Sequence, residues 1–322
     1  MKNTIKIIGI ISLTLVIGFT FFSCSSDGGG GSSGPPPTPP PPPDLRQPGL
    51  YAIPPPIVAS DAPLALTTTG DNIIAKSIAY INATPGTYTL LLDTDVSTAP
   101  TANLTGSSTL TIMGLRGMRT ITLSSTGNLF TIKAGTLILG KDITLKGFAI
   151  NTSSVINVST TSSSNPARFQ MENGSIITGN GARANSDNNK PGAGGAVLVN
   201  GGSFFDMKGG EIKGNNAVYG GGVNVQGSIA GTTFTMSGGT ITDNTAMYAG
   251  SVGDPGYGGG VAVMGSTEGG TFILNSPATK ANIHGNQAYI DSVLKPNQVR
   301  VFTPGKIQGT AALTTEEKAS GW

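Results

Sequence analysis

The second half of this chain carries an internal repeat, which restricts the fold more than any other feature of the sequence. Its form is Phe-x-Met-x-Gly-Gly-x-Ile-x-x-Asn-x-Ala, followed after a variable gap by Gly-Gly-Gly-Val-x-Val. The best copies span residues 205–225 and 234–263, with degenerate copies at Phe169-x-Met171, reaching Ile176, and at Phe272. Each copy contains three short segments in which alternate residues are apolar, which is the period of a β-strand. Such units bury their apolar faces by stacking on one another.

Three strands in each repeat predict an all-β fold, a right-handed single-stranded parallel β-helix with three faces per coil. Equivalent residues then lie about 4.8 Å apart on successive coils. The glycine pairs suit the corners between faces, where a positive φ is cheap for glycine alone. The stacked columns are predicted to be Phe205, Phe234 and Phe272 inside the coil, and an amide ladder of Asn215, Asn244 and Asn286 at a corner.

Upstream of the repeat, further short apolar runs predict strands separated by turns. These runs are Tyr88–Leu92, Thr109–Ile112, Thr120–Leu123, Phe130–Ile132, Leu137–Leu139, Ile143–Leu145 and Val155–Val158. One segment differs, because Ile74, Ile78 and Ile81 have the spacing of one helical face. We expect a short helix over Asp71–Ala83, begun by Asp71, that covers the open end of the first coil.

The first residues follow the plan of a secretion signal, with Lys2 and Lys6 before an apolar run from Ile7 to Phe22. A membrane-spanning anchor is the alternative reading of that run. Glycine and proline dominate the next segment, which cannot bury a core. The expected organisation is a signal peptide over residues 1–23, a disordered tether over 24–60 with Cys24 at its start, and a β-helix domain over 61–322.

The ending Phe21-Phe22-Ser23-Cys24 resembles the lipobox of bacterial lipoproteins. The phenylalanine two positions before the cysteine departs from the usual small residue and is similar to the relaxed lipoboxes of spirochaetes. The resemblance implies that Cys24 carries a diacylglycerol thioether and an acylated amine, which anchor the protein to a membrane. It also implies export and a place in the bacterial cell envelope, at the outer membrane or cell surface.

The repeats resemble two families of surface proteins over residues 148–302. Residues 194–197 (Gly-Gly-Ala-Val), 148–151 (Phe-Ala-Ile-Asn) and 272–275 (Phe-Ile-Leu-Asn) are similar to the GGA[ILV] and FxxN motifs of chlamydial polymorphic outer membrane proteins. The glycine-rich repeat behind a lipobox resembles the β-helix surface lipoproteins of spirochaetes, in the pectate-lyase-like superfamily. These resemblances imply surface display and adhesion.

The charge balance and the rare residue types exclude several classes of function. Of the 19 basic residues, Lys2 and Lys6 belong to the leader, which leaves 19 − 2 = 17 basic against 17 acidic residues. No basic stripe for a nucleic-acid partner is present. Because Cys24 and His284 are the only residues of their types, disulfides, cysteine-based zinc sites and multi-histidine metal sites are excluded. We expect no cofactor and no metal.

A polysaccharide-cleaving enzyme is the alternative function, since β-helices also house lyases and glycosidases. Those reactions need clustered carboxylates, which would stand in one column on neighbouring coils. No column of the repeat carries two acids, so we expect no enzyme and no catalytic residue. The columns are Gln170, Asp206, Thr235 and Ile273; Glu172, Lys208, Ser237 and Asn275; and Ser175, Glu211, Thr240 and Asn282.

Insertions indicate where a ligand could bind. The gaps Asn180–Gly194 and Asn244–Gly258 are longer than Asn215–Gly220, and they should project from one edge of the coil. Asp187 and Asp254 lie in these insertions, either as ligand contacts or as solvated turn residues. The sequence leaves three functions open: adhesin-like binding of a host surface or glycan, a polysaccharide-cleaving enzyme, and a purely structural envelope component.

Overall fold

The computed structural model divides the chain into two units, residues 1–43 and 44–322. It describes residues 46–58, 61–65, 72–100, 103–160, 162, 164–181, 194–228, 230–247, 256–265, 269–290, 293–302, 305–314, 317 and 321–322. The predicted leader, Cys24 and the Pro35–Pro43 stretch lie outside this part. So do residues 182–193 and 248–255, which hold Asp187 and Asp254.

The described residues form four β-sheets, whose strand orders follow the stacking of the repeats. Sheet A is β1 (Gly49–Tyr51), β2 (Thr87–Leu92), β4 (Thr109–Gly114), β7 (Gly135–Leu139), β10 (Ala167–Met171), β13 (Phe204–Met207), β17 (Thr233–Met236), β21 (Thr271–Leu274) and β26 (Lys306–Gln308). Sheet B is β22 (Ile283–His284), β18 (Thr240–Thr242), β14 (Glu211–Lys213), β11 (Ser175–Thr178), β8 (Ile143–Lys146), β5 (Arg119–Leu123) and β3 (Val96–Thr98). Sheet C is β25 (Val299–Val301), β20 (Val261–Gly265), β16 (Val223–Gly227), β12 (Val197–Asn200), β9 (Ile156–Ser159) and β6 (Phe130–Ile132), and sheet D is β15 (Asn216–Ala217), β19 (Thr245–Ala246), β23 (Gln287–Ile290) and β24 (Val293–Pro296).

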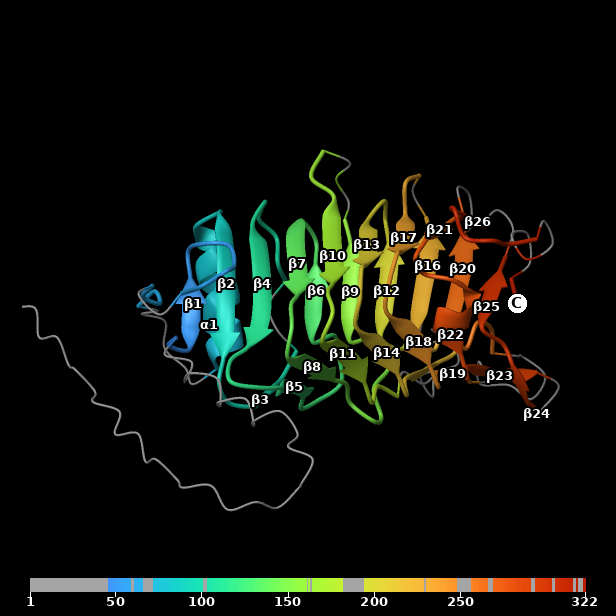
Figure 1. Ribbon diagram of the computed structural model, residues 1–322, viewed down its shortest axis with the longest axis horizontal. Helices are drawn as coiled ribbons and strands as arrows, with labels where there is room; N and C mark the ends of the chain where they lie inside the picture. The colour runs from blue at the N-terminus through green and yellow to red at the C-terminus, as the bar shows by residue number, and fades with distance from the viewer. Residues whose placement is uncertain are drawn as a thin grey trace, which may run out of the picture. The chain divides into compact units, whose positions relative to one another are not determined.

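From β4 onward the chain visits sheets A, B and C in turn, and we call one such passage a circuit (Figure 1). The strands of sheet D lie between sheets B and C in the later circuits. Among the named strands, only the pairs β1–β2 and β23–β24 are antiparallel, and the neighbours from successive circuits are parallel. The strands predicted upstream of the repeat all form, with ends within two residues of those expected. A predominantly β fold of long parallel sheets is therefore confirmed.

The predicted phenylalanine column lies in the core between the sheets. Phe205 pairs in register with Phe234, which pairs with Phe272, and all three are fully buried. Their ring centroids are 4.6 and 4.9 Å apart and the rings are nearly parallel. Phe169 adds a fourth ring, 4.9 Å from Phe205. The repeat thus stacks its largest side chain on itself, which gives each circuit one preferred register.

The asparagine ladder is also confirmed and is longer than expected. Asn215 donates to the side-chain oxygen of Asn244 at 3.1 Å, and Asn244 donates to that of Asn286 at 3.0 Å. Asn286 in turn donates to the side-chain oxygen of Gln298 at 2.9 Å. The ladder therefore ends on a glutamine that lies directly before β25. Two further asparagines precede these, with Asn151 donating to Asn180 at 3.0 Å.

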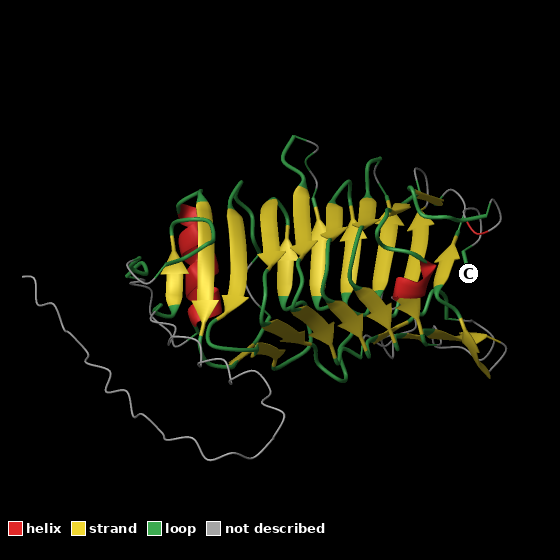
Figure 2. Ribbon diagram, in the orientation of Figure 1, coloured by secondary structure: helices red, strands yellow, loops and turns green. Residues whose placement is uncertain are grey.

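Helix α1 (Ile73–Ala83) covers one end of the core, as expected (Figure 2). Ile74, Ile78 and Ile81 are buried in the main hydrophobic cluster. The N-cap is Asn72, whose side chain accepts hydrogen bonds from the backbone of Ile74 and Ala75, whereas Asp71 lies outside the described residues. Within the part of the chain that the structure describes, no helix has the length and apolar character needed to cross a membrane.

One strand lies before residue 61, the expected start of the β-helix domain. Strand β1 pairs with β2, and Leu50 and Tyr51 are buried. Tyr51 and Ile57 pack against Leu91 on the outer surface of sheet A. A three-residue run between prolines has too little periodicity to be recognised as a strand, so the expected tether over 24–60 included a segment that the fold uses.

One repeat position is shifted by a residue from the expected alignment. Ile177, not Ile176, aligns with Ile212 and is fully buried, while Ile176 aligns with Glu211. The corner after Met171 is one residue longer than the corresponding corner after Met207, which moves the inward position along by one. The column before the buried isoleucines therefore contains Ile176 in place of Ser175, and it still carries one acid.

Candidate functional site

Most of the residues that the sequence singled out lie outside the described part. The lipid attachment at Cys24 and the loop acids Asp187 and Asp254 remain predictions for that reason. His284 is described, and it lies exposed at the end of β22, in register with Thr242. Among the residues that the structure describes, no three His, Cys, Asp or Glu side chains come together as a metal site would require.

Two acids of the sheet surfaces, Glu172 and Glu211, are paired with basic side chains. Glu172 lies 3.6 Å from Lys208, its neighbour in the same column on the next circuit. Glu211 is paired with Lys213 on its own strand. These two acids are neutralised by cations beside them, and neither is brought against a second carboxylate by an alignment of strands. That arrangement serves a solvated sheet surface better than acid–base chemistry.

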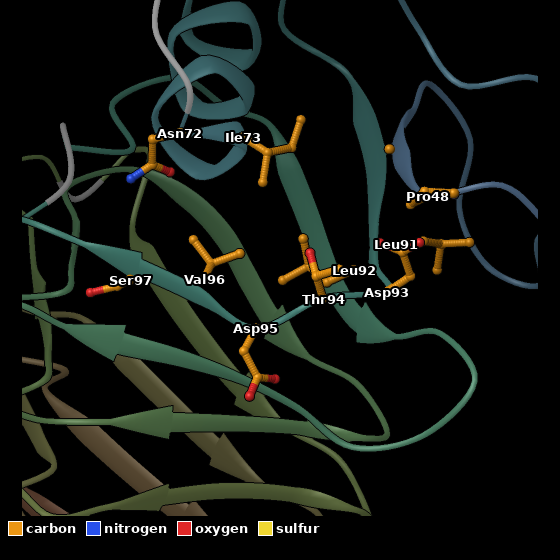
Figure 3. Close-up of a pocket in the computed structure, with 11 residues that line it drawn as sticks. Pro48, Asn72, Ile73, Leu91, Leu92, Asp93, Thr94, Asp95, Val96 and Ser97 are labelled. Atoms are coloured by element: carbon orange, nitrogen blue, oxygen red, sulfur yellow. The ribbon is translucent and has the colours of Figure 1, made fainter.

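A cavity of about 550 Å³ lies near the start of α1 (Figure 3). It contains the acids Asp93 and Asp95, beside the helix cap Asn72. Asp95 accepts the backbone N–H of Thr120 at 2.9 Å, and Asp93 lies 3.9 Å from Arg116. The two acids of this pocket thus connect the segment after β2 to residues at the start of β5 and just before it. None of the polar groups in this pocket is arranged as a nucleophile with a base.

A second cavity, a groove of about 440 Å³, lies on the outer surface of sheet A. Its floor is formed by outward side chains of β4, β7 and β10, and Pro54 and Pro55 border it. Threonines, Met113 and Ile138 make up much of the lining, together with Gln170 and Glu172. The groove therefore mixes hydroxyl groups with aliphatic surface.

Three aromatic side chains and one arginine lie together beside sheet C. We call this group the aromatic ladder; its members are Tyr219, Tyr257, Phe302 and Arg300. The tyrosine rings are nearly parallel with centroids 6.2 Å apart, and Phe302 packs edge-on to Tyr257 at 5.0 Å. The Arg300 guanidinium lies 5.9 Å from the Tyr257 ring and 5.7 Å from the Phe302 ring, within cation–π range. The three rings are half-buried and Arg300 is exposed.

Local sequence explains why the two tyrosines stack. Each directly precedes a glycine triplet, and Tyr219 and Tyr257 form a parallel bridge between successive circuits. The next residues, Gly220 and Gly258, have φ of 60° and 68°. A Cβ on either would lie within 2.3 Å of a backbone oxygen, so the corner needs glycine there. The corner recurs in both good copies of the repeat and places the two tyrosines one above the other.

Amide groups lie on the sheet next to the ladder. The outward column of sheet C is Asn157, Leu198, Asn224, Ala262 and Arg300. The side-chain oxygens of Asn157 and Asn224 are buried and accept no hydrogen bond. A buried acceptor left without a donor costs roughly 1–3 kcal/mol. The column thus holds two unused acceptors in line with the arginine of the aromatic ladder.

The aromatic ladder is not among the sites predicted from the sequence, although the sequence contains a signal for it. Both good copies of the repeat read Tyr-Gly-Gly-Gly-Val, and the tyrosine was not taken as part of the repeat. Phe302 has no equivalent in those copies, so only the structure places it beside Tyr257. No protein-family model, no curated protein and no solved structure matches this chain.

Proposed function

We propose that this chain is a bacterial envelope lipoprotein that binds a glycan through the aromatic ladder. In this proposal the described sheets are a right-handed parallel β-helix with three faces per coil. A lipid on Cys24 anchors the protein at the outer membrane or cell surface, and the function is adhesin-like.

The proposal of a β-helix rests on the chain path. Successive circuits visit sheets A, B and C in the same order with parallel pairing, so every circuit returns to its starting sheet one strand further along. Parallel strands joined by a crossover are right-handed in about 98% of cases. The stacked phenylalanines and asparagines agree with one coil per repeat.

The aromatic ladder is the observation that supports glycan binding. A sugar ring presents C–H groups that pack on the electron-rich face of an aromatic ring, and its hydroxyls donate to amide oxygens. Tyr219 and Tyr257 are rings of this kind, half-buried beside sheet C and nearly parallel to each other. Arg300 adds an exposed donor at the other side of Tyr257. Binding is favoured over cleavage because the surface acids Glu172 and Glu211 are ion-paired.

A glycan array probed with the purified protein tests the proposal. Tyr257→Ala should weaken any glycan bound by the natural protein about tenfold, which corresponds to roughly 1.4 kcal/mol. Tyr257→Phe keeps the ring face and should retain binding. Phe204→Ala is the matched control, because Phe204 is also half-buried but lies on sheet A. Equal binding by Tyr257→Ala and the natural protein would refute the ladder as the site.

The anchor needs its own experiment. Cys24→Ser should release the protein from the membrane fraction, and metabolic labelling with a fatty acid should mark the natural protein alone. Protease treatment of intact cells, followed by immunodetection, should remove a domain displayed at the surface. Full protection of the domain would contradict surface display and favour a periplasmic role.

A further inference from the structure

The groove on the outer surface of sheet A continues a surface that the chain itself already covers. At the first circuit the segment 51–57 lies over β2, where Tyr51 and Ile57 pack on Leu91. Leu91 points outward from the sheet and is nevertheless fully buried. The hydroxyl of Thr89 donates to the backbone oxygen of Ile53 at 2.8 Å. A proline-rich stretch is thus held by one hydroxyl donor and one apolar contact.

The equivalent positions on the next circuit are less covered: Thr111 is 4% exposed and Met113 is half-buried against the same cluster, whereas Thr89 and Leu91 have no exposed surface. In register with Thr89 and Leu91 are Thr111 and Met113 on β4, and both line the groove. Ile138 and Gln170 follow Thr111 in the same outward column. Gly140 lies in the groove beside Met113, and a Cβ there would approach the Met113 Cγ to 2.7 Å, so the glycine leaves the floor open.

Pro54 and Pro55 form the border between the covered and the open part. An occupant of the groove would therefore lie beside the chain's own prolines and meet a hydroxyl donor and aliphatic side chains of the same kinds. Polyproline II segments suit such a surface, because their backbone carbonyls are free to accept hydrogen bonds and little conformational entropy is lost on binding.

We propose that this groove binds a proline-rich, extended peptide segment of a partner protein. Thr111 donates to a backbone carbonyl of the peptide, as Thr89 does to Ile53, and Ile138 and Met113 pack against its prolines. The site lies on sheet A and is independent of the aromatic ladder beside sheet C.

Fluorescence anisotropy with the full-length protein tests this. The probe is a labelled peptide with the sequence Ala-Ile-Pro-Pro-Pro-Ile-Val, which copies residues 52–58. The natural protein should bind it, and a peptide with alanine at the three prolines should bind at least tenfold more weakly. Ile138→Asp places a charge in the groove and should abolish binding.

Ile273→Asp is the matched control, because Ile273 is half-buried in the same outward column but is no part of the groove. Thr111→Val keeps the shape of the floor and should weaken binding about fivefold through the lost hydrogen bond. It remains informative if Ile138→Asp fails to fold. Absence of binding to the natural protein, or equal loss in the Ile138 and Ile273 variants, would overturn the proposal. If oligosaccharides displaced the peptide, and if their binding were lost in Ile138→Asp, the groove would be assigned to a glycan instead.

Discussion

The side-chain amide of Asn215 donates to the side-chain oxygen of Asn244 at 3.1 Å, and both residues are fully buried. The same oxygen also accepts the backbone N–H of Asn215, at 3.0 Å. Asn244 then donates to the backbone oxygens of Ile212 and Thr242. One side chain thus satisfies backbone groups of its own circuit and of the preceding one, at a corner where strand pairing is interrupted.

Replacing Asn244 by alanine should be strongly destabilising. The change removes the acceptor of the buried backbone N–H of Asn215 and a donor to the carbonyl of Ile212, at roughly 1–3 kcal/mol for each unsatisfied group. We expect the free energy of unfolding in urea to fall by about 3 kcal/mol. Asn200→Ala is the control, because Asn200 is a half-buried asparagine outside the ladder and should change stability by less than about 1 kcal/mol. Equal effects of the two substitutions would show that the ladder carries no special stabilisation.

The phenylalanine column makes a graded prediction. Phe234 stacks on a ring at each side, Phe205 and Phe272, whereas among the described rings Phe272 stacks on Phe234 alone. Truncating a buried phenylalanine to alanine costs about 3–5 kcal/mol. Phe234→Ala should therefore cost more than Phe272→Ala, by about the 0.5–1.5 kcal/mol of one aromatic pair. Chemical denaturation of the two variants measures the difference, and a larger loss at Phe272 would contradict the argument.

Repetition made the interior of this fold predictable. Identical residue types recur at equivalent positions of the repeat, as with Phe205 and Phe234 or Asn215 and Asn244. When successive copies stack, these equivalent residues contact one another, so the contacts follow from the repeat itself. Strand β1 could not be predicted in this way, because Tyr51 is buried by Leu91, a residue forty positions later with no partner in the repeat. Ile177 was misplaced for a related reason, since a one-residue change in corner length is invisible until the strands are aligned.

The candidate site was less predictable than the core. Tyr219 and Tyr257 share a sequence position, so their stacking could have been derived from the repeat. Arg300 and Phe302 belong to the last, degenerate circuit, and only the parallel register of β25 on β20 brings them to Tyr257. The proposed glycan site therefore includes residues from the circuit where the repeat ends, and the repeat pattern carries no information about those residues.

The cap of helix α1 can be tested separately from the sheets. Asn72 accepts the backbone N–H of Ile74 at 2.9 Å, and its amide also bonds to the Thr98 hydroxyl of β3. Asn72→Ala should lower the free energy of unfolding by about 1 kcal/mol, the usual loss for an N-cap. Asn72→Asp keeps the accepting oxygen and should lose less. If both substitutions cost the same, the bond to Thr98 matters more than the cap.

Acid should weaken the attachment of the C-terminal segment through Glu317. The hydrogen bond from the Lys280 side chain, followed by that from the Thr314 backbone, lowers the pKa of Glu317 below its ordinary value of 4.5. Lys280 begins the 3-10 helix η1 (Lys280–Asn282), so the ion pair ties Glu317 to the last circuit. A carboxyl whose pKa is lower in the folded state stabilises the fold above pH 4.5, and that contribution disappears as the pH falls through the folded pKa.

The natural protein should therefore be more stable than Glu317→Gln at pH 7, and the difference should vanish as the pH falls below 4.5 toward the lowered pKa. Thermal unfolding of both proteins across this pH range gives the comparison. Glu211→Gln serves as the control, because the partner of Glu211 is Lys213 on the same strand and their pairing joins no separate segments. A difference between natural protein and Glu317→Gln that showed no decline as the pH fell below 4.5 would mean that the glutamine acts through lost packing, not through the charge on Glu317.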